Sequence, residues 1–117
     1  MALILYVEDH PPAQMLMQAI IADLTTHQLI VTGTGEAARK AAAEYRPDLY
    51  IVDLDLPDVD GLVLAQLLKG VHAAPVLLVS AYGESVKDET IKTVVHAYLA
   101  KPLDPVHVAQ TIQRTLA

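Results

Sequence analysis

The sequence predicts an α/β domain built on a doubly wound parallel sheet of five strands, with helices on both faces. Short apolar runs alternate with segments of helical period, and this order is typical of parallel strands joined by right-handed crossover helices. The runs do not alternate with polar residues, as expected for strands that are covered on both faces. A length of 117 residues with 53% hydrophobic residues suits one core. We therefore expect residues 1–117 to form a single domain.

The predicted strands are the five runs that are richest in Val, Ile, Leu and Tyr. Their lengths of four or five residues favour strands over helices. In chain order they are Leu3–Val7, Gln28–Thr32, Leu49–Val52, Pro75–Val79 and Ala97–Ala100.

A helix is predicted after each run. Pro11 and Pro12 suit the first turn of the first helix, in which Leu16, Ile20 and Leu24 share one face. The second helix is indicated by four small residues that suit close packing on a sheet, Ala37, Ala38, Ala41 and Ala42.

The last three helices differ in how clearly they are indicated. Leu64 and Leu68 share a face in the third helix, and the fourth, Glu84–Thr93, is the most polar. Asp104 is a candidate N-cap before Pro105. The fifth helix then places three residues on one face, Val108, Ile112 and Leu116.

The net charge of −6 is concentrated in two short segments. Setting six acids aside leaves equal numbers of acidic and basic residues. No basic residues form a run, which disfavours direct binding of nucleic acid. The six acids are Glu8, Asp9, Asp53, Asp55, Asp58 and Asp60.

Composition also limits the location and the chemistry of the chain. There is no cysteine, so disulfides and thiolate metal sites are excluded. The start of the chain lacks a basic leader, and no apolar stretch reaches the ~20 residues that cross a bilayer. We expect a cytoplasmic protein with no membrane contact.

Polar residues fall where four of the five predicted strands end. Glu8 and Asp9 follow the first strand, Asp53 the third, Ser80 the fourth and Lys101 the fifth. In open α/β sheets, ligands bind beyond the carboxyl ends of the strands. Strand ends are often polar simply because loops meet water, which explains each residue alone but the combination poorly.

Three carboxylates at one sheet edge would require a counter-charge. Glu8, Asp9 and Asp53 carry only oxygen ligands, which suit Mg²⁺ or Mn²⁺, and the backbone carbonyl of Asp55 could add another oxygen. The alternative is that the acids from Asp53 to Asp60 form a turn into a helix, whose N-terminus favours acids.

Asp53 is the best candidate nucleophile because it ends a central strand. A carboxylate can form an acyl phosphate, and phosphoryl transfer then needs mainly positioning and charge neutralisation. A metal, Lys101 and the Ser80 hydroxyl could each contact one phosphoryl oxygen. Taken singly, a Lys before Pro is often a solvated loop residue and a Ser at a strand end often caps the next segment.

Four motifs resemble the receiver domains of bacterial two-component systems, and the likeness extends along essentially the full chain. They are Glu8-Asp9, residues 53–61, Ser80-Ala81 and residues 98–102. The resemblance implies a flavodoxin-like fold with strand order 2-1-3-4-5 and a signalling switch rather than an enzyme, although such domains can catalyse their own phosphorylation and dephosphorylation. It also implies that Glu8 and Asp9 hold Mg²⁺, that Asp53 accepts phosphate from a histidine kinase or phosphotransfer protein, and that Lys101 binds the phosphoryl group.

The same resemblance implies a switch and an output surface. Ser80 would move toward the phosphate and Tyr98 would rotate inward behind it, although Tyr98 could equally be a core residue. A downstream protein would bind the region 84–116, and a phosphorylation-dependent dimer is compatible with the family. The Lys101–Pro102 peptide bond is expected to be cis. No output domain is visible, and the chain could be a piece of a longer protein.

The chain departs from the family pattern in places. Val94-Val95 stands where Gly-Ala is common, so the end of the fourth helix could differ. Asp55 and Tyr82 occupy positions that influence phosphate lifetime in the family, which leaves that lifetime open.

Two other functions compete with the switch. Asp53-Leu-Asp55 resembles the paired aspartates of haloacid-dehalogenase-type phosphatases, but those proteins are considerably longer and usually carry Thr or Val where Pro57 stands. A degenerate receiver that serves only to bind proteins is the second alternative; the presence of every expected acceptor-site residue type disfavours it.

Overall fold

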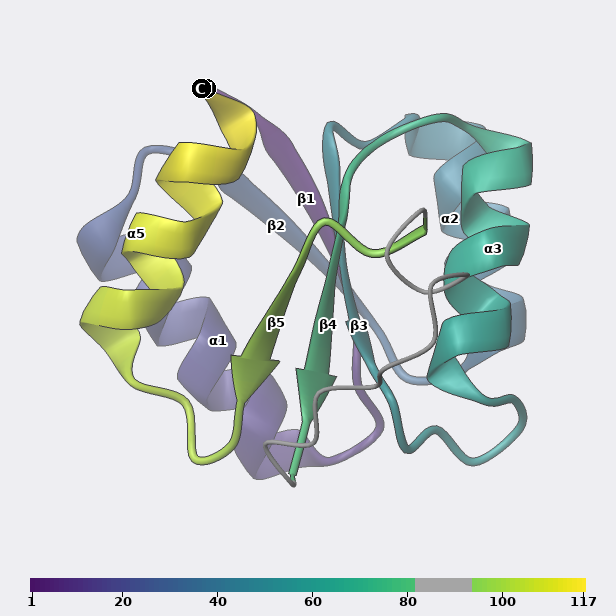
Figure 1. Ribbon diagram of the computed structural model, residues 1–117, viewed down its shortest axis with the longest axis horizontal. Coiled ribbons are helices and arrows are strands. Elements are labelled where there is room, and N and C mark those ends of the chain that lie inside the picture. The colour runs from purple at the N-terminus through teal and green to yellow at the C-terminus, as the bar shows by residue number, and fades with distance from the viewer. Residues whose placement is uncertain (82–93) are drawn as a thin grey trace.

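Five parallel strands form one sheet in the predicted order β2-β1-β3-β4-β5 (Figure 1). The strands are β1 (Leu3–Val7), β2 (Gln28–Thr32), β3 (Leu49–Asp53), β4 (Val76–Ser80) and β5 (Ala97–Ala100). This computed structural model describes residues 1–81 and 94–117. Tyr82 and the helix predicted over 84–93 lie outside the described residues.

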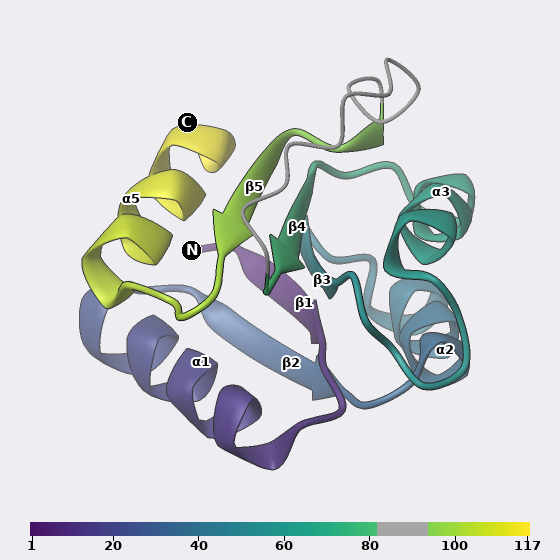
Figure 2. The same cartoon turned by 60° about the horizontal axis from the view of Figure 1, so that its bottom comes forward.

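Helices cover both faces of the sheet, as predicted (Figures 1 and 2). On one face lie α1 (Pro11–Leu24) and α5 (Pro105–Leu116), and on the other lie α2 (Gly35–Tyr45) and α3 (Gly61–Val71). Because side chains alternate along a strand, the central strands contribute to both cores. Tyr6 packs with α1 and α5, whereas its neighbours Leu5 and Val7 pack with α2 and α3.

Three strand boundaries differ from the prediction by one residue. β4 begins at Val76 instead of Pro75, because proline has no N–H to donate to the ladder. β3 extends through Asp53 and β4 through Ser80, so both residues belong to the sheet itself. The backbone N–H of Leu54 still donates to the carbonyl of Val79, at 2.9 Å. The pairing with β4 therefore fixes the backbone of Asp53.

The predicted buried face of α1 was right only at Ile20 and wrong at Leu16 and Leu24. The helix buries Met17, Ile20 and Ile21, while Leu16 and Leu24 are exposed. Apolar residues occupy nearly every side of this helix, so their period cannot select the stripe that meets the sheet. Contact with the sheet makes that selection.

The other predicted helix faces agree with the structure except at one alanine. Ala37 is exposed, because it lies on the outer side of the first turn of α2. Asp104 caps α5 through the N–H of Val106, as expected. The residues buried as predicted are Ala38, Ala41 and Ala42 of α2, Leu64 and Leu68 of α3, and Val108 and Ile112 of α5.

A close backbone approach joins β3 to the start of α3. The N–H of Gly61 donates to the carbonyl of Leu54 at 3.0 Å, and the Asp60 carboxylate caps the helix by accepting from the N–H of Leu62 at 2.8 Å. A Cβ at Gly61 would lie 2.2 Å from the carbonyl oxygen of Asp53. Only glycine allows α3 to begin this close to the end of β3.

We expect Gly61→Ala to destabilise the fold by about 1–3 kcal/mol, because the new methyl group must displace backbone. Gly70→Ala in the same helix is the matched control, since a Cβ there meets nothing within 4 Å. The control should be more stable than the wild type by ~0.5–1 kcal/mol, through helix propensity and a less flexible unfolded chain. Urea unfolding measures both changes, and equal effects of the two substitutions would contradict the close approach.

Candidate functional site

The sheet register brings Glu8 beside Asp53. Val7 of β1 pairs with Val52 of β3, so the next residue of each chain segment lies at the same level. On the other side, Asp53 pairs with Val79 of β4. Both acids therefore lie at the carboxyl edge of the sheet, where the sequence predicted a site.

Lys101 joins the two carboxylates. Its ammonium nitrogen lies 2.7 Å from Asp53 Oδ2 and 3.4 Å from Glu8 Oε1. The backbone N–H of Lys101 also donates to the carbonyl of Ser80 at 2.8 Å, which ties the end of β5 to the end of β4. The Lys101–Pro102 peptide bond is cis, as the sequence resemblance implied.

The second oxygen of Asp53 is also held. Asp53 Oδ1 accepts a hydrogen bond from the backbone N–H of Asp55 at 3.0 Å. The carboxylate of Asp53 is thus fixed at Oδ2 by Lys101 and at Oδ1 by the loop that follows β3. Such double support holds a reacting group in one orientation.

Burial sets the protonation of the pair. Glu8 is only 1% exposed and Asp53 only 2%. Burial, followed by the neighbouring Asp53, raises the pKa of Glu8 to about 8. Burial also opposes ionisation of Asp53, but Glu8, Lys101 and the Asp55 N–H outweigh that effect and lower the pKa of Asp53. Asp53 is therefore the charged member of the pair at neutral pH.

The predicted gathering of three carboxylates is not found. Within residues 1–81 and 94–117, no three acidic or histidine side chains are grouped closely enough to hold a metal ion. Lys101 supplies a counter-charge to Glu8 and Asp53, and the Asp9 side chain is exposed to solvent.

The donor set nevertheless fits a hard divalent cation. Glu8 Oε2 is buried and has no hydrogen-bond partner, and two buried carboxylates share a single ammonium. The excess negative charge can be neutralised by a proton on Glu8 or by a cation that prefers oxygen ligands. Asp9 directly follows Glu8 in the chain, and Asp55 lies two residues after Asp53.

Ser80 and Tyr98 lie on the opposite face of the sheet from the Glu8–Asp53–Lys101 site. Strand alternation groups Ser80 with Leu78, which packs with α2 and α3, and Leu78 pairs with Tyr98. Ser80 is 8% exposed and Tyr98 is 36% exposed. The interpretation of Tyr98 as a buried core residue is therefore wrong for this conformation.

Two contacts near the site were not predicted. The side chain of Gln14 donates to the backbone carbonyl of Glu8, and the carboxylate of Asp58 accepts from the N–H groups of Gly35 and Glu36. Asp58 was predicted only as part of the acidic segment. No local pattern indicates either contact, because each partner lies in another element.

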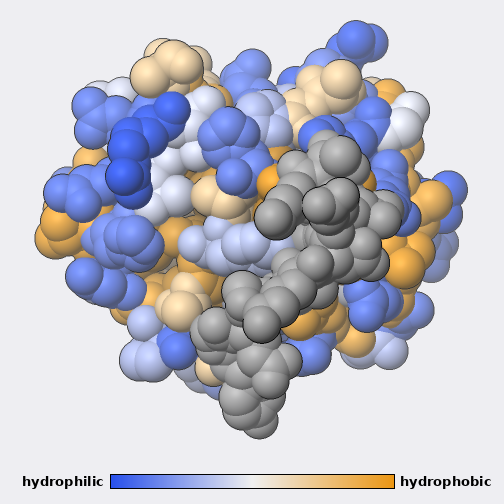
Figure 3. Space-filling view, in the orientation of Figure 1, coloured by the Kyte–Doolittle hydropathy of each residue, from blue (hydrophilic) through white to orange (hydrophobic). Residues whose placement is uncertain are grey.

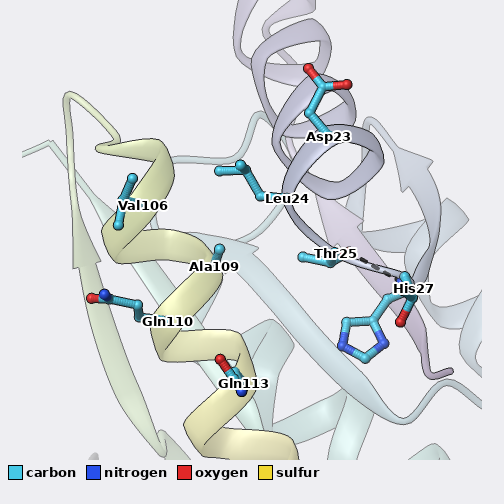
Figure 4. Close-up of a pocket in the computed structure, with 9 residues that line it drawn as sticks. Asp23, Leu24, Thr25, His27, Val106, Ala109, Gln110 and Gln113 are labelled. Carbon is cyan, nitrogen blue, oxygen red and sulfur yellow. Dashed lines mark hydrogen bonds between the residues drawn. The ribbon is translucent and has the colours of Figure 1, made fainter.

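A groove elsewhere on the molecule does not belong to this site. It lies between the end of α1 and α5, and Leu24, His27 and Gln113 are among the residues that line it (Figure 4). None of its lining residues belongs to the Glu8–Asp53–Lys101 site.

Polar and apolar residues are interspersed over the face shown in Figure 3. In the part of the chain that the structure describes, no helix is long and apolar enough to cross a membrane.

Comparison with known proteins points to one family. The model of the response regulator receiver domain matches residues 4–113. The chain is 36% identical over 105 residues to the transcriptional regulatory protein KdpE of Mycobacterium tuberculosis, covering 87% of this chain and 45% of KdpE. It is 31% identical to the polar-differentiation response regulator DivK of Brucella anthropi, covering 97% of this chain and 94% of DivK. The chain thus spans less than half the length of KdpE and nearly all of DivK.

A solved structure shows the same fold. The receiver domain of the sensor histidine kinase PA1611 from Pseudomonas aeruginosa PAO1 superposes with a TM-score of 0.85 at 24% identity, over 98% of this chain and 97% of that one. That structure is described as having a magnesium ion coordinated in its active-site cleft.

In the absence of divalent ions, we expect the free energy of unfolding to fall as the pH rises from about 5 to 8. The pKa of Glu8 is raised from 4.5 to about 8 by folding, so its stabilising contribution is complete below pH 4.5 and is lost as the pH rises through 8. The slope should approach ~1.4 kcal/mol per pH unit. The lowered pKa of Asp53 and the raised pKa of Lys101 place both titrations outside this range.

Urea unfolding with chelator at several pH values measures this slope, and Glu8→Gln is the matched variant. Glutamine imitates the protonated acid, so the variant should lose the part of the slope that Glu8 causes. An identical pH dependence in both proteins would show that Glu8 does not titrate in this range.

Proposed function

The chain belongs to the response regulator receiver domain family, and we propose that it is a signalling switch in which Asp53 accepts a phosphoryl group. The observation that best supports this role is the buried Asp53 carboxylate, held at both oxygens beside Lys101. The donor would be a histidine kinase or a histidine phosphotransfer protein. The downstream partner is a protein, with no direct contact to nucleic acid or membrane.

The proposed step is a transfer from a phosphorylated histidine. An oxygen of Asp53 forms a bond to phosphorus while the bond from phosphorus to the imidazole nitrogen breaks, and that nitrogen keeps the electron pair. Lys101 then exchanges its contact with Asp53 for one with a phosphoryl oxygen, and the Ser80 hydroxyl donates to another. Both residues already lie at the ends of neighbouring strands.

We further propose that Glu8, Asp9, Asp53 and the backbone carbonyl of Asp55 hold Mg²⁺, which Mn²⁺ could replace. When bound, such an ion neutralises charge on the phosphoryl oxygens. The unpaired buried oxygen of Glu8 supports this assignment from within the chain.

Ser80 and Tyr98 are the proposed switch. A phosphoryl group on Asp53 gives the Ser80 hydroxyl a new acceptor, and its movement changes the space available to the Tyr98 ring. The exposed ring lies on β5, within the proposed output region 84–116, of which residues 84–93 lie outside the described part. Three further points stay predictions. They are a phosphorylation-dependent dimer, an effect of Asp55 and Tyr82 on phosphate lifetime, and a cytoplasmic location.

The receiver assignment also bears on the alternative of a phosphatase. The family model covers residues 4–113, and receiver domains are regulatory. Lys101 reaches Asp53, whereas Asp55 contributes its backbone N–H to Asp53. A single phosphorylation event is therefore the expected behaviour, in place of steady turnover of a phosphate ester.

Incubation with acetyl phosphate and Mg²⁺ should add one phosphoryl group to the chain. The reason is that Asp53 is the ionised carboxylate of the site. Asp53→Asn or removal of the ion with a chelator should abolish the addition, which intact-protein mass spectrometry measures directly. Asp23→Asn, on the exposed surface of α1, is the control and should be labelled like the wild type. Full labelling of the Asp53→Asn protein would disprove the assignment.

Beryllofluoride, which imitates the aspartyl phosphate, should shift the amide NMR signals of Tyr98 and of α5 as well as those near Asp53. Moving a 1:99 equilibrium to 99:1 requires about 5.5 kcal/mol. New hydrogen bonds to a charged group, worth ~1.5–3 kcal/mol each, can supply a large part. Ser80→Ala should lose the distant shifts while retaining those near Asp53. Shifts confined to the surroundings of Asp53 in the wild type would rule out this route.

A further inference from the structure

We propose that Asp58 is a positioning residue, which holds the loop of residues 54–60 against α2 and thereby fixes the Asp53 carboxylate for phosphoryl transfer. This inference rests on the proposed function of Asp53 as the phosphoryl acceptor. Asp58 takes part neither in the ion pair with Lys101 nor in the proposed metal site.

Asp58 connects the loop to the N-terminus of α2. Its Oδ1 accepts from the N–H of Gly35 at 2.9 Å and its Oδ2 from the N–H of Glu36 at 3.3 Å. Thr34, the N-cap, accepts from the next two N–H groups of the helix. Its side chain accepts from Ala37 and its backbone carbonyl accepts from Ala38. The first N–H groups of a helix have no partner within the helix, so Asp58 completes the set from another part of the chain. The hydrogen bond from Gly35 is the main cause of the lowered pKa of Asp58.

Packing reinforces the same contact. A Cβ at Gly35 would lie 2.5 Å from Val59 Cγ1, and 3.4 Å from Asp58 Oδ2. The loop therefore lies directly on the first turn of α2, in a space that a larger residue would fill.

The loop is closed at its base by backbone contacts, so a displacement of Asp58 at its tip should also displace the backbone that contacts Asp53. Asp55 and Asp60 form an antiparallel bridge, and the N–H of Gly61 donates to the carbonyl of Leu54. The N–H of Asp55 is the donor to Asp53 Oδ1 at 3.0 Å. A continuous path thus leads from the α2 N-terminus through Asp58 and the loop backbone to the oxygen of the proposed acceptor.

The simpler alternative is that Asp58 only caps α2. A cap contributes stability, and its loss would lower the unfolding temperature without changing the reaction of the folded protein. A positioning residue affects the reaction itself, because a displacement of about 1 Å near a reacting group can cost up to ~100-fold in rate. The two alternatives therefore differ in the rate at saturating phosphoryl donor.

The test compares phosphorylation by acetyl phosphate in the wild type, Asp58→Ala and Asp58→Asn, at saturating Mg²⁺ and well below each unfolding temperature. We expect the saturating rate of Asp58→Ala to fall about tenfold, with the half-saturating acetyl phosphate concentration changed less than about twofold. Asp58→Asn keeps one acceptor oxygen and should recover most of the rate. The amide proton signal of Asp55 should move in Asp58→Ala, since its hydrogen bond to Asp53 changes.

Glu36→Ala is the matched control. It removes an exposed carboxylate from the same helix end, one that pairs with Lys40 at 3.5 Å, and leaves the backbone N–H that Asp58 accepts from. Its rate and the Asp55 signal should equal those of the wild type. A loss as large as that of Asp58→Ala would assign the effect to general charge and overturn the proposal.

A second pair of variants tests the contact from the α2 side. Gly35→Ala should slow phosphorylation because its methyl group meets Val59, and Gly35→Ala with Val59→Ala should restore the rate. If Asp58→Ala does not fold, this pair decides: rescue supports the proposal, and failure of Gly35→Ala to slow the reaction overturns it.

The possible failures can be told apart. A wild-type chain that takes no phosphoryl group on Asp53 overturns the proposed function and this inference with it. A wild type that is phosphorylated, with Asp58→Ala reacting at the same rate and an unchanged Asp55 signal, overturns only the positioning role of Asp58.

Discussion

Lys101 lies between two buried carboxylates, 2.7 Å from Asp53 and 3.4 Å from Glu8, and the other features of the site depend on this contact. One ammonium cannot balance two buried charges, so the pair must keep a proton or bind a cation. Burial and Asp53 place that proton on Glu8, whose pKa rises to about 8. Asp53 remains ionised, which suits it to the proposed role of phosphoryl acceptor.

The parallel sheet makes the contact among these three residues achievable. β4 lies between β3 and β5, so Lys101 must reach past the end of β4 to meet Asp53. The hydrogen bond from the Lys101 backbone N–H to the Ser80 carbonyl fixes the backbone position from which the Lys101 side chain extends. Ser80 is therefore connected to the site through its backbone carbonyl, which accepts from Lys101. In the proposed switch, a movement of Ser80 would be passed to β5, and hence to Tyr98, through the pairing of β4 with β5.

The loop after β3 gives the Asp53 carboxylate its second support. Its N–H at Asp55 holds Asp53 Oδ1, its closure at Gly61 brings α3 close to β3, and its tip at Asp58 rests on α2. Two helices on one face of the sheet are thus connected to a carboxylate that lies on the other face. Rigid elements of this kind hold a reacting group more accurately than an isolated loop would.

The sequence by itself determined the alternation of strands and helices, the residues at the strand ends and the Asp104 cap, because these follow from local period and chemistry. The strand order and the cis bond at Pro102 were predicted from the resemblance to a known family. The tertiary structure decided which side of α1 is buried, that the Asp9 side chain is exposed to solvent, and that Asp58 meets Gly35. A strand pattern that is apolar throughout does not reveal which face each end residue occupies, and a contact across 23 positions depends on packing that no local period encodes.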